Sequence, residues 1–372
     1  MRLVLPFWWW SVVASLPAGL SGLFAGVSNG VLLVGGGSNF PGAMPWKGGV
    51  KKYYNTGYVL SQPVAGTFSW LPDAVFRLPE ATAYGGSAEV PGGVVCVGGR
   101  TESGYTPFVY LLRWDPSARR VVTTPLPALP FGLACMAVTA IGNTVYVAGG
   151  EAASGSTDVF MSLDLSGPVP AWHDLPPLPL RMAYSVAVAQ SNGNHPCVYV
   201  LGGRTRTATG VSGLHSTVFC YDPASGRWTR MKDIMAAAGA AVPVNVSAAS
   251  AIPYGATSIA LIGGDHGELF TQLEQVDTAI AAARGSGNEV SAGMLAGQKE
   301  ALLASHPGFS KEIYVYNTVT DAWSDGGALP MPCPVTTKAV KWGDDICIPG
   351  GEIKPGVRTP SVILGRIAST KE

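Results

Sequence analysis

Residues 350–359 read Gly-Gly-Glu-Ile-Lys-Pro-Gly-Val-Arg-Thr, a diglycine followed at once by a carboxylate and then by two cations. This diglycine is the last of six, and each follows a short run of β-branched or aliphatic residues. The other five are Gly35-Gly36, Gly98-Gly99, Gly149-Gly150, Gly202-Gly203 and Gly263-Gly264. A pattern that recurs at similar intervals, with one longer gap, predicts an architecture of repeated units.

The composition favours an all-β protein. Of the 372 residues, 47% are hydrophobic and only 13% are charged, with 48 Gly and 29 Pro along the chain, which suits many short buried strands joined by tight turns. The 24 basic and 24 acidic residues cancel, and no block of like charge occurs, so we expect neither a nucleic acid nor a membrane as partner. The partner classes that remain are a small polar ligand and a protein.

Each repeat reads as a strand after Leu-Pro, an apolar strand ending in the diglycine, a polar loop, a strand with Tyr or Phe, and a strand with Trp. Six such units predict six four-stranded blades around a central channel, in one propeller spanning 1–372. The sixth unit lacks its tryptophan strand, whereas residues 1–20 contain Trp8-Trp9-Trp10 with no diglycine before them. We predict that 1–20 is the closing strand of the last blade, because this pairing leaves no open edge.

The same N-terminal segment also permits a different interpretation. The apolar run Leu3 to Val13, followed by Ala14 to Gly19, is typical of a secretory signal. The six cysteines show neither zinc spacing nor short-range pairs, which favours buried free thiols over disulfides. The expected location is the cytoplasm, or the periplasm if a signal peptide lies upstream of Met1.

Residues 267–310 are predicted to form a helical insertion in the fifth blade. Apolar Leu269, Leu273, Val276 and Ile280 recur at helical spacing, and the segment directly follows a diglycine. We expect this segment to form either a lid over the channel mouth or a decoration packed on the outside of the propeller.

The residue after each diglycine should emerge at one rim of the channel, because only glycine fits the turn before it. Five of these six residues are charged, and the set is Gly37, Arg100, Glu151, Arg204, Asp265 and Glu352. The charges pair with one another, or they form a site for a small acidic, hydroxylated molecule, with arginines binding a carboxylate and carboxylates moving protons. Lys51, Lys52, Arg181 and Arg358 are further cations in loops that reach the same rim.

The Gly-Glu-x-Lys-Pro-Gly-x-Arg-Thr motif, residues 22–29, residues 50–56 and the fifth-blade insertion together resemble the kelch-repeat N-acetylneuraminate epimerases, the mutarotases of sialic acid. The blade order differs, so the chain resembles a cyclically permuted branch of that family. The resemblance implies a six-bladed kelch propeller, an acidic sugar as partner, an isomerase activity without metal or other cofactor, and a monomer or homodimer.

The resemblance also implies roles for individual residues. Glu352 would be the proton acceptor and Arg358 its catalytic partner, and the cations beside Glu352 would keep it ionised. The substrate would be bound by Arg181, Arg204, Arg100, Lys52, Asp265 and Lys354. Mutarotation needs one proton taken from the anomeric hydroxyl and one delivered to the ring oxygen, so that the ring opens to the keto form and recloses on the other face.

Two other functions fit a kelch propeller. One is a protein-interaction or carbohydrate-binding module without chemistry. The other is a copper radical oxidase, which requires a Tyr-Cys pair and histidine ligands at the channel mouth, whereas the five histidines of this chain show no paired spacing.

Overall fold

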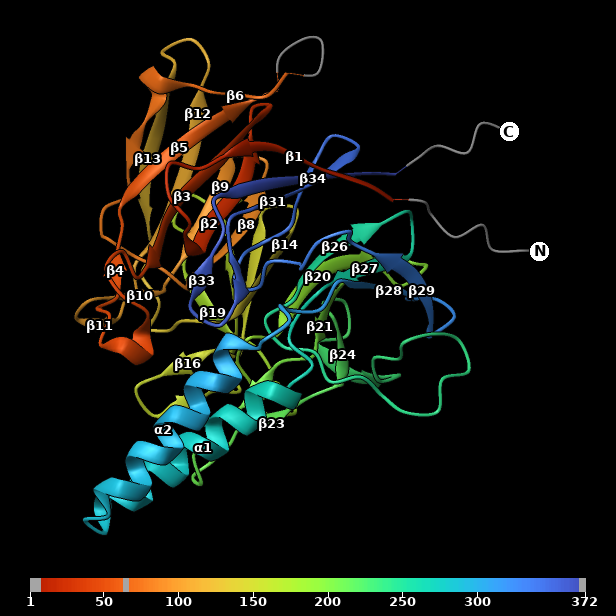
Figure 1. The fold of residues 1–372 in the computed structure, drawn as a ribbon. Coiled ribbons are helices and arrows are strands. Elements are labelled where there is room, and N and C mark those ends of the chain that lie inside the picture. The colour runs from red at the N-terminus through yellow and green to blue at the C-terminus, as the bar shows by residue number, and fades with distance from the viewer. Residues whose placement is uncertain (1–7, 63–66, 368–372) are drawn as a thin grey trace.

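The computed structural model describes residues 8–62 and 67–367, and these form a six-bladed β-propeller around a central channel (Figure 1). The first three blades, from the innermost strand outward, are β2 (Ser21–Ser28), β3 (Val31–Asn39), β5 (Thr56–Ser61) and β6 (Ser69–Trp70); β8 (Gly86–Val90), β9 (Gly93–Val97), β12 (Val109–Asp115) and β13 (Arg120–Leu126); and β14 (Ala137–Ile141), β15 (Thr144–Ala148), β18 (Phe160–Asp164) and β19 (Trp172–Asp174). In the first blade, β4 (Lys52–Tyr53) also pairs with β3, and β7 (Phe76–Arg77) with β5.

The other three blades follow the same plan. They are β20 (Val186–Ser191), β21 (Pro196–Leu201), β24 (Val218–Asp222) and β25 (Arg227–Met231); β26 (Ser250–Tyr254), β27 (Ser258–Ile262), β28 (Glu312–Asn317) and β29 (Ala322–Ala328); and β30 (Val340–Trp342), β31 (Asp345–Pro349), β34 (Ser361–Ile367) and β1 (Trp8–Ser15). The prediction of an all-β six-bladed propeller is therefore confirmed.

Four two-stranded hairpins extend the blades at the diglycine end. They are β10 (Arg100–Thr101) with β11 (Gly104–Tyr105), β16 (Glu151–Ala152) with β17 (Gly155–Ser156), β22 (Arg204–Thr205) with β23 (Gly213–Leu214), and β32 (Glu352–Lys354) with β33 (Val357–Arg358). The two 3-10 helices are η1 (Pro45–Lys47) and η2 (Pro72–Ala74).

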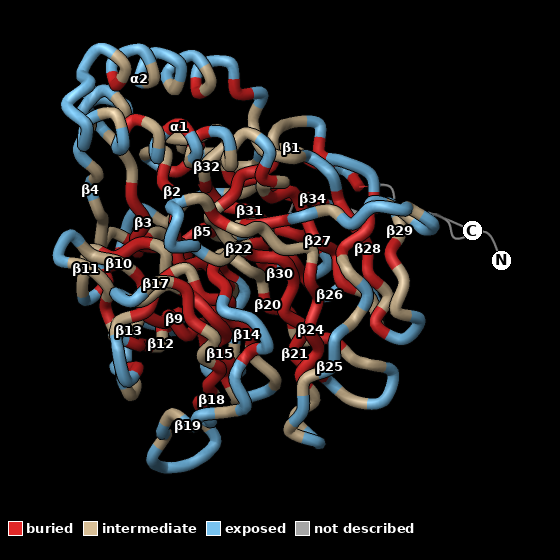
Figure 2. Tube along the Cα trace, turned by 90° about the horizontal axis from the view of Figure 1, so that it is seen from below, coloured by how far each residue is buried: buried red, intermediate tan, exposed pale blue. Residues whose placement is uncertain are grey.

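The hydrophobic core lies between neighbouring blades, where both faces of the second strands are covered (Figure 2). All five residues of β9 are buried, as expected for an apolar run without alternation. In four of the six blades, the repeated tryptophan fastens the blade to the one before it through the indole N–H. Trp70, Trp172, Trp228 and Trp323 donate to the carbonyl oxygens of Ser15, Pro127, Pro176 and Lys232 at 2.8, 2.8, 2.8 and 3.3 Å.

The ring is closed by the two ends of the chain, as predicted. β1 pairs antiparallel with β34 from Trp9 opposite Arg366 to Ser15 opposite Ser361, and the two strands lie side by side in Figure 1. Trp8 and Trp10 are buried between the fifth and sixth blades, and a Cβ on Gly365 would approach the Trp10 ring to 2.4 Å. Residues 1–7 of the predicted closing segment lie outside the described residues.

Six backbone hydrogen bonds form a closed circle around the channel. One residue at or just before the start of the innermost strand of each blade has a left-handed φ, and its N–H donates to the carbonyl oxygen of its counterpart in the preceding blade. We call these six residues the axial ring; with their φ values they are Gly22 (71°), Tyr84 (62°), Cys135 (54°), Tyr184 (55°), Ala248 (55°) and Thr336 (52°). The N···O distances are 2.7, 2.9, 2.7, 2.8, 2.8 and 3.3 Å in that order, beginning with Gly22 donating to Thr336.

The first diglycine differs from the predicted one by one residue. The two glycines with positive φ are Gly36 and Gly37 rather than Gly35 and Gly36, and the Gly37 N–H donates to the Thr82 carbonyl oxygen at 2.8 Å, as Gly99 does to Leu133. Three consecutive glycines give the sequence pattern no means of choosing the pair. The rim residue of this blade is therefore Ser38, which pairs with Ser21, and not Gly37.

The helical insertion after the fifth diglycine is also as predicted. It consists of α1 (Glu268–Gly285) and α2 (Glu289–Ala304), which pack together at the diglycine end of the propeller (Figures 1 and 2). Lys299 on α2 binds Asp277 on α1 at 2.5 and 2.7 Å. Neither helix is long and apolar enough to cross a membrane.

All six cysteines are free, and only Cys135 is not fully buried, which confirms the prediction of thiols without disulfides.

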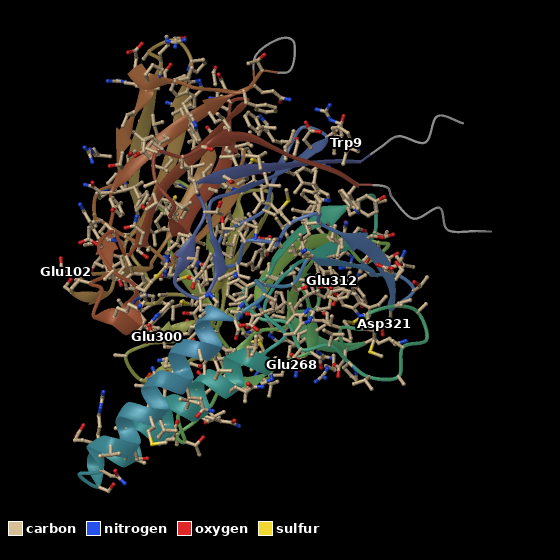
Figure 3. All side chains as sticks on the ribbon, viewed as in Figure 1. Trp9, Glu102, Glu268, Glu300, Glu312 and Asp321 are labelled. Atoms are coloured by element: carbon tan, nitrogen blue, oxygen red, sulfur yellow. The ribbon has the colours of Figure 1, made fainter. Side chains whose placement is uncertain are left out.

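Replacing Trp10 with alanine should destabilise the protein by about 3–5 kcal/mol, because it leaves a cavity at the seam of the ring. The measurement is the free energy of unfolding in urea. Trp9 lies in the same strand with its side chain outside (Figure 3) and is 68% exposed, so Trp9→Ala is the matched control and should change stability by no more than about 0.5 kcal/mol. Equal effects of the two variants would contradict closure by this strand.

Candidate active site at the diglycine end of the channel

A cavity of about 490 Å³ lies where the channel opens beneath the helical insertion. Its floor is made by Tyr84, Cys135, Tyr184, Ala248 and Thr336 of the axial ring, and its walls by the hairpins and loops that follow the diglycines. Its roof comes from both helices, through Phe270, Leu273, Glu274, Asp277, Lys299 and Leu303. Of the predicted site residues, Glu352, Arg358, Arg204, Arg100 and Asp265 line this cavity.

Glu352 and Arg358 form an ion pair across the β32–β33 hairpin. They occupy opposite positions in its register, and Arg358 Nη2 lies 3.1 Å from Glu352 Oε2. The other carboxylate oxygen, Oε1, accepts a hydrogen bond from the Gly356 N–H at 2.7 Å. The side chains are 15% and 6% exposed, so the pair is shielded from water yet faces the cavity.

Burial raises the pKa of Glu352 above its ordinary value, although Arg358, the Gly356 N–H, Lys51 and Arg204 each oppose the rise. The sequence had led us to expect that adjacent cations would keep the carboxylate ionised. Desolvation outweighs them because the side chain is almost completely enclosed. A carboxylate with a raised pKa is a stronger base once it is ionised.

Arg358 is held from three sides. Its Nε donates to Ser21 Oγ at 3.1 Å, its Nη2 donates to the Tyr84 hydroxyl at 3.5 Å, and its guanidinium carbon lies 4.6 Å from the centre of the Phe40 ring. Its Nη1 is buried and has no hydrogen-bond partner among the described residues.

The other two arginines of the cavity rest on aromatic rings. The guanidinium carbon of Arg204 lies 4.0 Å from the centre of the Tyr184 ring and 4.3 Å from that of Phe270 on α1, while Arg100 lies 4.7 Å from the centre of the Tyr105 ring. Stacking on a ring face orients a guanidinium but leaves its N–H groups in the ring plane free to bind an anion. Within the described residues, neither arginine forms a salt bridge, so the alternative in which rim charges neutralise one another holds for Glu352 and Arg358 but not for Arg100 and Arg204.

Three of the predicted binding residues lie elsewhere. Arg181 has a side chain that is 67% exposed and lies 3.7 Å from Asp158 outside the cavity. Lys52, the first residue of β4, is exposed over the Tyr54 ring, whereas Lys51, the residue before the strand, lines the cavity. Lys354 follows an irregularity in the register after Glu352 and does not line the cavity.

Other residues of the cavity were not among the predicted substrate-binding residues. Lys51, predicted only as a loop cation at the rim, lies 3.2 Å from the Tyr84 hydroxyl and 4.7 Å from the centre of its ring. Tyr84 and Tyr184 precede the innermost strands of their blades, whereas the predicted rim residues follow the diglycines. Phe40, Trp46, His306 and Phe270 come from loops and helices outside the repeat, so the repeat pattern offered no signal for them.

The insertion is fastened on opposite sides of the cavity. On α1, Glu274 accepts hydrogen bonds from the Ser212 N–H at 2.6 Å and the Ser212 hydroxyl at 2.9 Å. On α2, Glu300 binds Lys47 in the long loop of the first blade at 2.9 Å. The insertion therefore covers the channel mouth and is not a decoration packed on the outside of the propeller.

Among the described residues, the one group of three converging metal-ligand types is His195, Cys197 and Asp222. These residues lie where β21 begins and β24 ends, at the opposite end of the strands from the diglycine, and none of them lines the cavity. Within the described part of the chain, the cavity therefore lacks the histidine cluster that the copper-oxidase interpretation requires.

Comparison with known proteins agrees with the family resemblance of the sequence motifs. The sequence model of the N-acetylneuraminate epimerase family matches residues 126–372. N-acetylneuraminate epimerases from Haemophilus influenzae strain 86-028NP and Brucella melitensis biotype 1 are 25% and 28% identical to this chain over 65% of its length. The matches cover 60% and 58% of those relatives, so the chain spans about 60% of the length of the curated relatives it matches.

A solved structure, described as the structure of YjhT, is similar over nearly the whole chain. The superposition covers 97% of this chain and 99% of the other, with a TM-score of 0.63 and 16% sequence identity. At this identity the likeness shows the fold alone.

Replacing Arg358 with glutamine should raise the pKa of Glu352 further, because it removes the largest of the charges that oppose desolvation. The measurement is a pH titration of the Glu352 side-chain carboxyl by carbon NMR. Lys354→Gln removes a cation two residues from Glu352 but outside the cavity, and should leave the pKa of Glu352 unchanged. A larger effect of Lys354→Gln than of Arg358→Gln would contradict the arrangement described above.

Proposed function

This chain belongs to the N-acetylneuraminate epimerase family, and we propose that it interconverts the α and β anomers of free N-acetylneuraminate or of a closely related sialic acid. The observation that carries the proposal is the buried Glu352–Arg358 pair in a cavity rich in cations. Glu352 has the position, the enclosure and the raised pKa that a base for the anomeric hydroxyl needs.

Binding of an acidic sugar is supported by the charges that surround the carboxylate. Arg204 and Arg100 are oriented by aromatic rings and form no salt bridge among the described residues, so their N–H groups are available to a carboxylate. Phe40, Trp46 and Phe309 supply apolar surface at the same cavity, on which the acetamido methyl and the carbon skeleton of the sugar can pack.

The proposed reaction begins when Glu352 takes the proton of the anomeric hydroxyl. The electrons of that O–H bond become the new carbonyl bond while the bond from the anomeric carbon to the ring oxygen breaks, and the ring oxygen receives a proton. Rotation of the carbonyl group then presents its other face to the hydroxyl, and the same steps in reverse close the ring as the other anomer. Arg358 stabilises the negative charge both before and after the proton is transferred.

The helical insertion supports this function by covering the mouth of the cavity. Water competes for protons and weakens the attraction between charges, so enclosure strengthens the contact between the cations and the sugar carboxylate. The monomer or homodimer expected from the resemblance stays a prediction.

The decisive experiment is proton NMR of freshly dissolved α anomer with and without the protein. We expect anomer exchange to be faster than the spontaneous rate, and Glu352→Gln to reduce kcat by roughly 100-fold or more, since general base catalysis contributes about that factor. Asp344→Asn neutralises an exposed carboxylate at the other end of the same blade and is the matched control, with wild-type activity expected. A wild-type rate equal to the spontaneous rate would contradict the proposal.

A further inference from the structure

Tyr84 places its hydroxyl where four polar side chains meet on the cavity floor. The oxygen lies 3.1 Å from Ser38 Oγ, 3.2 Å from Lys51 Nζ, 3.4 Å from Ser21 Oγ and 3.5 Å from Arg358 Nη2. Two of these neighbours are cations, and they come from different blades, since Lys51 belongs to the first blade and Arg358 to the sixth. Only the closed ring brings this set together.

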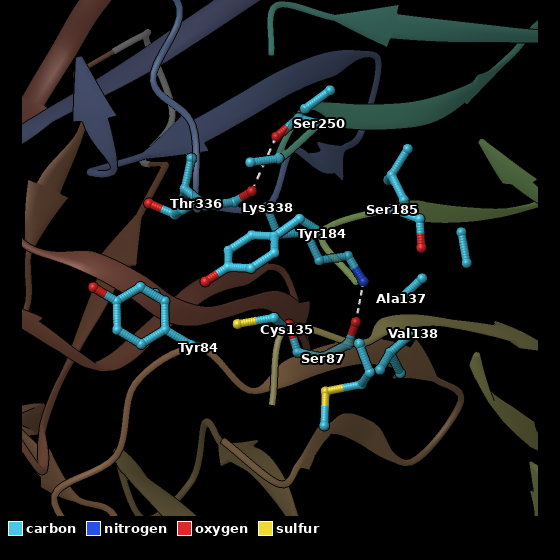
Figure 4. A pocket seen from close by; sticks show the side chains of 18 of the residues that line it. Tyr84, Ser87, Cys135, Ala137, Val138, Tyr184, Ser185, Ser250, Thr336 and Lys338 are labelled. Carbon is cyan, nitrogen blue, oxygen red and sulfur yellow. Dashed lines mark hydrogen bonds between the residues drawn. The ribbon is translucent and has the colours of Figure 1, made fainter. Parts of the chain in front are cut away.

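The backbone of Tyr84 is fixed more tightly than that of an ordinary loop residue. It belongs to the axial ring, donates to Gly22 at 2.9 Å, accepts from Cys135 at 2.7 Å, and holds a left-handed φ of 62°. Figure 4 shows its ring at the channel beside Cys135 and Tyr184. Such a non-glycine conformation persists only where the surrounding structure imposes it, so the hydroxyl is positioned in advance of ligand binding.

Tyr84 and Glu352 share one nitrogen of Arg358. Nη2 lies 3.1 Å from Glu352 Oε2 and 3.5 Å from the Tyr84 oxygen, so the carboxylate and the phenol are neighbours around a single guanidinium. Mutarotation requires a base and an acid at two oxygens bound to the same carbon atom. We propose that Tyr84 gives its proton to the ring oxygen as the sugar ring opens and takes it back as the ring closes, an inference that rests on the proposed function.

The proton count balances over this cycle. In ring opening, Glu352 gains the proton of the anomeric hydroxyl and Tyr84 loses its own to the ring oxygen, which leaves the open-chain keto sugar and a phenolate. In ring closure, the phenolate regains the proton of the attacking hydroxyl, and Glu352 returns its proton to the carbonyl oxygen, which becomes the new anomeric hydroxyl. No oxidant, reductant or further reactant is needed.

The surroundings of the Tyr84 oxygen favour the phenolate that this step creates. Burial by itself raises the pKa of the phenol, but Lys51, Arg358 and the hydroxyls of Ser21 and Ser38 oppose it, and the net result is a pKa below the ordinary value. An acid whose pKa is closer to neutrality gives up its proton more readily.

Two other groups of the cavity are less suited to this role. Burial, above all, raises the pKa of Tyr184 well beyond its usual range, and Arg204 stacks on the face of its ring. His306 accepts a hydrogen bond from the Gly308 N–H through Nδ1, which requires that nitrogen to be unprotonated, and burial lowers its pKa, so the imidazolium that could donate a proton is disfavoured.

The first test is Tyr84→Phe, which removes the hydroxyl and keeps the ring. In the NMR anomer-exchange assay, kcat should fall by roughly 100-fold to 10,000-fold, while KM and the melting temperature change little. Tyr110→Phe is the matched control, because Tyr110 belongs to the same blade, lies outside the cavity and has a buried hydroxyl without a partner among the described residues. It should keep the wild-type kcat.

The second test keeps the hydroxyl but changes its acidity, by placing 3-fluorotyrosine at position 84. The groups facing the oxygen, Lys51, Arg358, Ser21 and Ser38, stay the same, so a purely structural role predicts an unchanged pH profile. Proton donation by Tyr84 predicts that the loss of kcat/KM at high pH moves to lower pH.

The outcomes separate this inference from the proposed function. If the wild type is active, Glu352→Gln is inactive and Tyr84→Phe retains the wild-type kcat, the role of Tyr84 is refuted and the mutarotase function stands. If fluorination leaves the pH profile of kcat/KM unchanged, proton donation by Tyr84 is also refuted. A wild type without activity refutes the proposed function itself.

Discussion

The closed circle of six backbone hydrogen bonds in the axial ring is the constraint on which the rest of this structure depends. Each bond joins one blade to the next, and the last bond, from Gly22 to Thr336, joins the first blade to the sixth. A buried N–H without a partner is costly, so the circle favours complete closure over any open arrangement. It also holds five non-glycine residues in left-handed backbone conformations that they rarely adopt alone.

This constraint positions the candidate site. Residues of the axial ring form the cavity floor, and in five blades the residue after the diglycine pairs with the residue just before the axial-ring member, as Arg100 does with Ala83 and Glu352 with Val335. The charged side chains therefore start from backbone that is fixed on both sides. Beneath the circle, the half-buried Lys338 reaches across the channel to the Ser87 carbonyl oxygen (Figure 4), and so adds one more contact between the sixth and second blades.

Aromatic rings and loops outside the repeat complete the site. Phe270 on α1 is a second ring beside the Arg204 guanidinium in addition to Tyr184, and Phe40 lies beside that of Arg358. A cation between or against aromatic faces is attracted without being neutralised. The cavity thus keeps two arginines available to an anionic ligand, while Glu352, which is ion-paired to Arg358, is the carboxylate to which we assign the proposed proton transfer.

The amino-acid sequence by itself determined the number of blades, the closure by the N-terminal segment 1–20, the helical insertion and the places of Glu352 and Arg358, because each depends on a local pattern of strand, glycine and charge. Only the tertiary structure decided that Lys51 rather than Lys52 enters the cavity, that Ser38 occupies the rim of the first blade, and that burial raises the pKa of Glu352 despite its cations. It also brought Tyr84 to Lys51 and Arg358. These features depend on which way a side chain faces and on how much water closure excludes, and neither quantity is fixed until segments distant in the chain have met.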